Sequence, residues 1–138
     1  MDYASLKARY ESVRSGTTTC AHATLRWIAP TDGDMRRFAS KLEASASSMG
    51  RDTVLAAVTG WSGVLVCDLI AEFENPEETL DFSRDALSAL MDSQTEWLDR
   101  LIVDILAKQG QRKEAMETER KKREPASIGK QTSVKAVR

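Results

Sequence analysis

Histidine and cysteine, the residues that most often act as nucleophiles, bases and metal ligands, are rare in this chain. There is one histidine, His22, and there are two cysteines, Cys20 and Cys67. A catalytic serine or cysteine needs a neighbouring base, and a structural zinc ion needs about four ligands, so Cys20 and His22 complete neither kind of site. We expect His22 to lie in an ordinary loop or strand, and Cys67, inside an apolar run, to be buried and inert. The chain is therefore predicted not to be an enzyme, with no catalytic residue, metal site or cofactor.

Two other segments lack residues that known sites require. Gly60-Trp61-Ser62-Gly63 has no lysine for a phosphate-binding loop, and its serine is followed directly by glycine, unlike the serine of a nucleophile elbow. The acidic residues between Cys67 and Asp104 do not form the regular Asp-x-Asp-x-Asp-Gly loop of a calcium site. We interpret them as a solvated acidic face.

Charge is divided unevenly along the 138 residues, whose formal net charge is −1. Residues 1–109 carry 11 basic and 17 acidic side chains, whereas residues 110–138 carry 9 basic and 4 acidic ones. The basic residues of this tail include Arg112, Lys113 and the cluster Arg120-Lys121-Lys122-Arg123, which could neutralise phosphates. The tail contains no aromatic residue for base stacking, so we expect it to be solvated or to bind a protein, and not nucleic acid.

Composition predicts one domain that does not contact a membrane. The chain is 41% apolar, yet it has no stretch of roughly 20 apolar residues and no apolar signal core near Met1. We expect it to stay in the cytosol, with both thiols reduced. Its length allows one modest core.

Apolar residues recur mainly at helical spacing. The patterns over residues 3–13, 31–50 and 52–61 predict helices, whereas Ser15–Thr19 interrupts the first pattern. Ala23–Ile28 predicts a short extended segment.

Three residues are predicted to begin helices. Thr31 and Ser83 are good N-caps, and Ser93-Gln94-Thr95-Glu96 has the sequence of a capping box. The last two helices would then form a hairpin or corner. The conformation of residues 64–81 stays open, since a short apolar run followed by an acidic segment fits a strand or a helix equally well.

The predicted fold is mainly α: a small helical domain over residues 1–109 with at most one short β element, followed by a basic, flexible C-terminal tail over residues 110–138. Too little apolar surface exists in the tail to offset the entropy lost on ordering it. The predicted core consists of Phe38, Leu42, Leu55, Val58, Trp61, Leu87, Leu90, Trp97, Leu101 and Ile105.

One sequence pattern goes beyond generic helices. From Leu55 the chain reads L-A-A-V-T-G-W-S-G-V, then an acidic linker, then L-D-F-S-R-D-A-L-S-A-L-M, then W-L-D-R-L-I. This pattern resembles tail assembly chaperones of long-tailed (siphovirus-type) bacteriophages, over roughly residues 24–106. The linker Leu65–Leu80 is longer than in that family. The matching positions are Val58, Gly60, Trp61, Gly63, Val64, Phe82, Ser83, Leu87, Leu90, Trp97 and Leu98.

The resemblance implies a non-enzymatic chaperone. Such proteins bind the tape measure protein, help to recruit tail tube subunits in the host cytoplasm, and are absent from the mature virion. A homo-oligomer is left open. Covering exposed apolar helix surface would require an amphipathic groove and no nucleophile.

Partner-binding residues are expected to include two tryptophans and several tail cations, although Trp61 also fits a core position. Two other classes remain: a structural virion protein, such as a head–tail connector or minor tail component, and a small nucleic-acid-binding protein. The expected partner-binding residues are Trp61, Trp97, Arg112, Lys113, Arg120, Lys121, Lys122 and Arg123.

Overall fold

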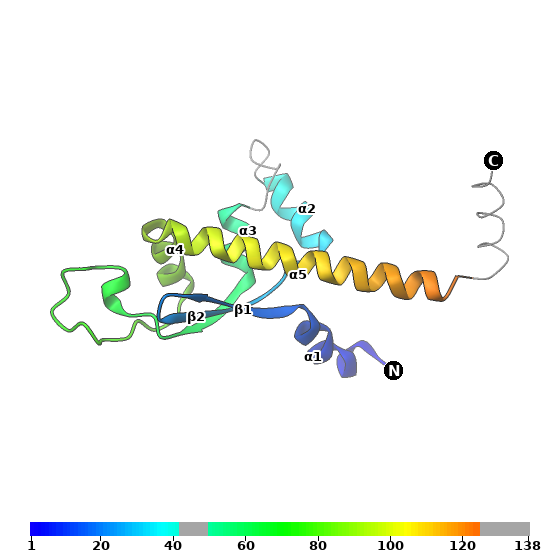
Figure 1. The fold of residues 1–138 in the computed structure, drawn as a ribbon, viewed down its shortest axis with the longest axis horizontal. Coiled ribbons are helices and arrows are strands. Elements are labelled where there is room, and N and C mark those ends of the chain that lie inside the picture. Colours follow the sequence, from blue (N-terminus) through cyan, green and yellow to red (C-terminus); the bar gives the residue numbers. More distant parts are fainter. Residues whose placement is uncertain (42–49, 125–138) are drawn as a thin grey trace.

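The computed structural model describes residues 1–41 and 50–124, and its longest helix runs along the whole body (Figure 1). This helix, α5, contacts α1, β1, α3 and α4. The elements, in chain order, are α1 (Tyr3–Arg14), β1 (Ser15–Cys20), β2 (Ala23–Ile28), α2 (Asp32–Lys41), α3 (Arg51–Ala57), β3 (Val58–Ser62), the 3-10 turn η2 (Val66–Asp68), α4 (Arg84–Ser93) and α5 (Thr95–Lys122).

The fold is α+β, so the prediction of a mainly α domain with at most one short β element is wrong. In the described part of the chain, three strands form an antiparallel sheet in the order β1-β2-β3. Periodicity missed β1 because Ser-Gly-Thr-Thr-Thr-Cys contains no large apolar residue, although the branched threonines favour strands. It missed β3 because that strand follows α3 directly.

Trp27 of β2, which is only 3% exposed, packs its side chain against the neighbouring strand β1. A Cβ on Gly16, its partner on β1, would lie 2.4 Å from the Trp27 ring, so this close approach requires glycine. Trp27 Nε1 donates to the Thr18 hydroxyl at 3.0 Å, and that hydroxyl donates to Asp104 of α5 at 2.7 Å. These bonds connect the sheet to α5.

The helix predicted over residues 52–61 ends early, at Ala57. Arg84 Nη1 donates to the carbonyl oxygens of Leu55 and Val58 at 2.7 and 2.5 Å, which satisfies acceptors at the helix end. Trp61 then pairs with Leu25 in the sheet. An arginine from α4 thus stabilises the change from helix to strand.

The core lies between the sheet and helices α3, α4 and α5. Burial confirms seven predicted core residues: Val58, Trp61, Leu87, Leu90, Trp97, Leu101 and Ile105. Leu55 is partly buried, whereas the side chain of Phe38 and all of Leu42 lie outside the described residues. The core also includes strand residues that the prediction omitted: Cys20, Ala23, Leu25 and Trp27.

Two predicted helix caps are confirmed and one is wrong. The backbone N–H groups of Asp34 and Ala86 donate to Thr31 Oγ1 and Ser83 Oγ at 3.1 and 3.0 Å. Ser93, however, is the last residue of α4, and Gln94 occupies the N-cap position of α5.

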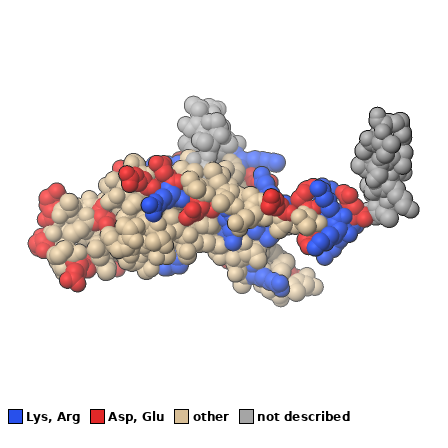
Figure 2. Space-filling view, viewed as in Figure 1, with Lys and Arg blue, Asp and Glu red and all other residues tan. Residues whose placement is uncertain are grey.

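The sequence left the conformation of residues 64–81 open, and residues 64–80 form a loop that is closed at its base. The backbone N–H of Leu80 donates to Val64 O, and that of Val66 donates to Glu78 O, both at 2.8 Å. The loop projects at the end of the molecule opposite the C-terminal end of α5 (Figure 1), and acidic side chains gather there (Figure 2).

The closed loop brings Trp61 and Phe82 together. Trp61 Nε1 donates to Leu80 O at 2.8 Å, and the two aromatic rings meet edge to face with centroids 5.0 Å apart. Despite the long linker, the two halves of the motif are in contact.

The predicted environment of Cys67 is wrong, because this residue is half-buried while Cys20 is only 1% exposed. His22 lies in the turn between β1 and β2, which agrees with its predicted position in an ordinary loop or strand. Its Nε2 pairs with Asp68 Oδ2 at 2.9 Å.

Helix α5 continues without a break from the predicted domain, residues 1–109, into the predicted tail. Its residues 110–122 are mostly exposed, and residues 125–138 lie outside the described part of the chain.

Candidate partner-binding groove

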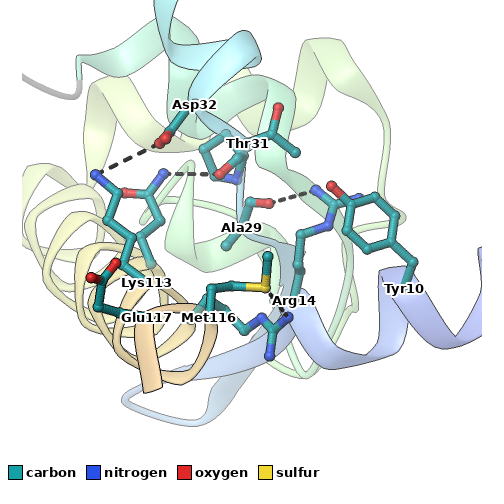
Figure 3. Close-up of a pocket in the computed structure, with 11 residues that line it drawn as sticks. Tyr10, Arg14, Ala29, Thr31, Asp32, Lys113, Met116 and Glu117 are labelled. Carbon is teal, nitrogen blue, oxygen red and sulfur yellow. Dashed lines mark hydrogen bonds and ion pairs between the residues drawn. The ribbon is translucent and has the colours of Figure 1, made fainter. Parts of the chain in front are cut away.

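A groove of about 460 Å³ opens between α1, the segment after β2, and the middle of α5 (Figure 3). We call it the α1–α5 groove. Its lining residues are Tyr10, Arg14, Ala29, Pro30, Thr31, Asp32, Gln109, Arg112, Lys113, Met116 and Glu117.

Arg14, the last residue of α1, is fixed at one wall of the α1–α5 groove. Its carbonyl oxygen accepts from the backbone N–H of Ala29 at 2.9 Å, and its Nη1 donates to Ala29 O at 2.8 Å. The Tyr10 ring, one helical turn earlier, lies 4.3 Å from the guanidinium carbon. Figure 3 shows the guanidinium between Tyr10 and Ala29.

Helix α5 forms the opposite wall and is held by two contacts with the segment after β2. Gln109 Nε2 donates to Pro30 O at 3.0 Å, and Lys113 Nζ lies 3.7 Å from Asp32 Oδ1. Met116, 65% exposed, adds a large apolar side chain to the lining.

The charges of the groove are only partly balanced. Its two carboxylates have cationic partners: Asp32 pairs with Lys113, and Glu117 pairs with Arg120. The hydrogen bond from Arg120, together with its charge, holds the pKa of Glu117 below its ordinary value, so this carboxylate is ionised at neutral pH. Among residues 1–41 and 50–124, Arg14 and Arg112 have no carboxylate within ion-pair distance. Within the described residues, the groove therefore presents two guanidinium groups that have no ion-pair partner, although each contacts a neutral group of the groove lining.

An exposed apolar stripe on α1 continues from the groove. Tyr3, Leu6 and Tyr10 follow helical spacing and are 60%, 42% and 37% exposed, and no residue of α1 is buried. Contiguous exposed apolar side chains on a helix mark a surface that can pack against another helix.

The tryptophans predicted to bind a partner lie in the core, away from the groove lining. Trp61 and Trp97 are 7% and 8% exposed. The Trp97 ring meets His22 edge to face, with centroids 6.4 Å apart. Their positions favour a role in packing.

The predicted basic residues fall into two groups. Arg112 and Lys113 line the α1–α5 groove. The cluster Arg120-Lys121-Lys122-Arg123 lies further along α5, where Arg120, Lys122 and Arg123 pair with glutamates of the same helix and its end. For Lys121 no acidic partner is found within the described ranges.

Sequence reasoning missed Tyr10, Arg14 and Met116 as groove residues. The spacing of Tyr3, Leu6 and Tyr10 was a usable signal, because an apolar stripe needs a partner. No sequence signal pointed to Arg14, because its contact with Ala29 depends on the hairpin that lies between the two residues.

No protein-family model, curated protein or solved structure matches this chain. Within the described residues, no three histidine, cysteine or acidic side chains are placed to hold a metal ion. No helix of that part is long and apolar enough to cross a membrane.

Proposed function

We propose that this chain is a non-enzymatic tail assembly chaperone of a long-tailed bacteriophage. It binds helical segments of the tape measure protein and helps to recruit tail tube subunits. It works in the host cytoplasm and is left out of the finished virion.

The observation that carries the proposal is the exposed apolar stripe of α1 beside the α1–α5 groove. Helix α1 buries none of its residues, so its exposed apolar side chains are uncovered, and a second helix is a natural occupant for them. A protein that shields apolar helices from aggregation needs a surface of this kind.

The arrangement of the family-like motif supports the class of partner. The Gly60-Trp61-Ser62-Gly63 and Leu80–Ser83 segments meet through the bond from Trp61 to Leu80 and the contact between Trp61 and Phe82. Parts of the pattern that are distant in sequence thus form one packed unit. This contact accommodates the long linker as a projecting loop.

The proposal predicts that co-expression will keep the tape measure protein soluble. We would express the tape measure protein from the same phage alone, with this chain, or with a Leu6→Glu/Tyr10→Glu variant. Charges on the exposed stripe should prevent apolar packing without disturbing the core, because α1 buries no residue. We expect the tape measure protein to be soluble and to co-purify only with the unaltered chain.

Insoluble tape measure protein in every arm would contradict the proposal. Mass spectrometry of purified virions provides the second test: abundant chain in the particles would favour a structural virion protein. A third outcome would favour a nucleic-acid-binding protein: the purified chain is retained on DNA at low salt, is released at high salt, and does not bind the tape measure protein.

A further inference from the structure

The projecting loop, residues 64–80, is strongly negative and carries an exposed apolar side chain. Over residues 67–83 the chain has six acidic residues and no basic one. Glu72 and Glu74 are exposed and have no cation within ion-pair distance among the residues that the structure describes. Ile70 is 49% exposed. We call this segment the acidic loop (Figure 2).

Hydrogen bonds hold the acidic loop in one shape. The backbone N–H groups of Glu77 and Glu78 donate to Asn75 Oδ1 and Asn75 O at 3.1 and 3.2 Å, which forms a turn. At the base of the loop, Gln94 Nε2 donates to Asp68 O at 2.8 Å and ties the loop to the start of α5. A loop that is already ordered loses little conformational entropy when it binds.

The α1–α5 groove has the opposite charge and also offers apolar surface. Arg112 is partly exposed in its lining and has no carboxylate partner within residues 1–41 and 50–124. Tyr10 and Met116, 37% and 65% exposed, supply apolar area. The two carboxylates of the groove pair with Lys113 and Arg120, which reduces their repulsion of another acidic group.

Positive charge extends from the groove along α1. This helix carries three basic residues and one acidic residue. Lys7 and Arg9 are exposed, and neither has a carboxylate within ion-pair distance in the described part of the chain. The wall formed by α1 therefore adds to the attraction for a negatively charged segment.

One molecule cannot fill its groove with its own acidic loop. Gln94, which holds the loop, and Gln109, which lines the groove, are fifteen residues apart on α5, or about 22 Å of helix. The loop also projects at the end of the molecule opposite the C-terminal end of α5 (Figure 1). An acidic loop that enters the groove must therefore come from another copy of the chain.

We propose that the α1–α5 groove of one copy binds the acidic loop of a second copy. The loop glutamates face Arg112 and the cations of α1, and Ile70 packs on Tyr10 and Met116. Because the two surfaces differ and lie apart, each bound copy still offers a free loop or a free groove, so the contact repeats head to tail. A contact between one loop and one groove is small, so it is weak, reversible and reduced by salt.

The test measures self-association of the full chain by analytical ultracentrifugation over a range of concentrations, at low and high salt. The groove variant is Arg112→Gln, and its control is Lys121→Gln, an exposed cation of the same helix outside the groove lining. The loop variant is Glu72→Gln/Glu74→Gln. Its control is Glu96→Gln/Asp99→Asn, two exposed acids of α5 outside the loop. Circular dichroism checks that each variant is folded.

We expect the unaltered chain to form species that grow with concentration and dissociate at high salt. The groove variant and the loop variant should each associate about tenfold more weakly, whereas both controls should behave like the unaltered chain.

A mixture of the two variants gives the sharpest result. The groove variant keeps an intact loop and the loop variant keeps an intact groove, so one intact contact can form between them. The mixture should associate more tightly than either variant alone and stop at pairs. A monomeric unaltered chain at every concentration, equal effects of variants and controls, or no gain on mixing would overturn the loop-in-groove contact.

This contact does not depend on the proposed function, and the two proposals can fail separately. Self-association as described, without capture of the tape measure protein, would support the contact and contradict the proposed function. Capture of the tape measure protein by a chain that stays monomeric would overturn the contact and leave the proposed function standing.

Discussion

At the scale of single residues, the fold depends on bonds between distant parts of the chain. The Thr18 hydroxyl bridges Trp27 and Asp104, and Arg84 holds the carbonyl oxygens where α3 becomes β3. Each of these side chains satisfies groups that would otherwise lose hydrogen bonds on burial. None of these hydrogen bonds follows from the local spacing of residues. For this reason the sequence predicted which residues are buried better than it predicted which side chains hydrogen-bond to one another.

The two cysteines should differ in reactivity. Burial raises the pKa of the Cys20 thiol, and thiolate is the reactive form, so both access and ionisation protect this residue at neutral pH. Cys67 is half-buried in the projecting loop. We expect a maleimide reagent to modify Cys67 first in the native protein, and Cys20 only after denaturant is added.

Peptide mapping by mass spectrometry identifies the labelled residue, and a Cys67→Ser variant shows the rate for Cys20 alone. Labelling of both thiols at equal rates without denaturant would show that Cys20 is not enclosed by the core.

At the scale of elements, helices and their apolar faces were more predictable than strands. Thr31, Ser83 and the stripe from Trp97 to Ile105 carried clear local signals. Strand β1 carried no apolar pattern, because Gly16 and Thr18 matter through their contacts with Trp27 on the next strand. A sheet of this kind is specified by cross-strand pairs, which a local pattern cannot show.

The α1–α5 groove was predictable only in part for the same reason. Arg112 and Lys113 were expected to contact a partner, whereas Arg14 reaches the groove only because the hairpin places Ala29 beside it. The tryptophans were attractive candidates by residue type, but both are buried in the core.

The two serines near α4 should affect stability differently. Ser83 caps α4 through a 3.0 Å bond from Ala86 N, so Ser83→Ala should lower the free energy of unfolding by about 1 kcal/mol. Ser93 is exposed at the end of the same helix and caps nothing in α5, so Ser93→Ala should change it by less than about 0.5 kcal/mol. Urea denaturation of the two variants and the unaltered chain measures both effects. A larger loss from Ser93→Ala than from Ser83→Ala would contradict the observed helix boundaries.

At the scale of the whole molecule, α5 joins two regions with different roles. Its N-terminal half contributes Trp97, Leu101 and Ile105 to the core, whereas the stretch from Gln109 to Glu117 forms a wall of the groove. No residue of α5 after Ile105 is buried in the described structure. Stability and partner binding should therefore be separable along this one helix.

Capture of the tape measure protein by two truncated chains tests the central claim most directly. Residues 1–124 keep both walls of the α1–α5 groove, whereas residues 1–108 keep the core and lose the wall formed by α5. We expect both truncated chains to fold with melting temperatures close to that of the full chain. Chain 1–124 should capture the tape measure protein as the full chain does, and chain 1–108 should capture little or none. Equal capture by a folded chain 1–108 would contradict the account, since binding would then not depend on the groove.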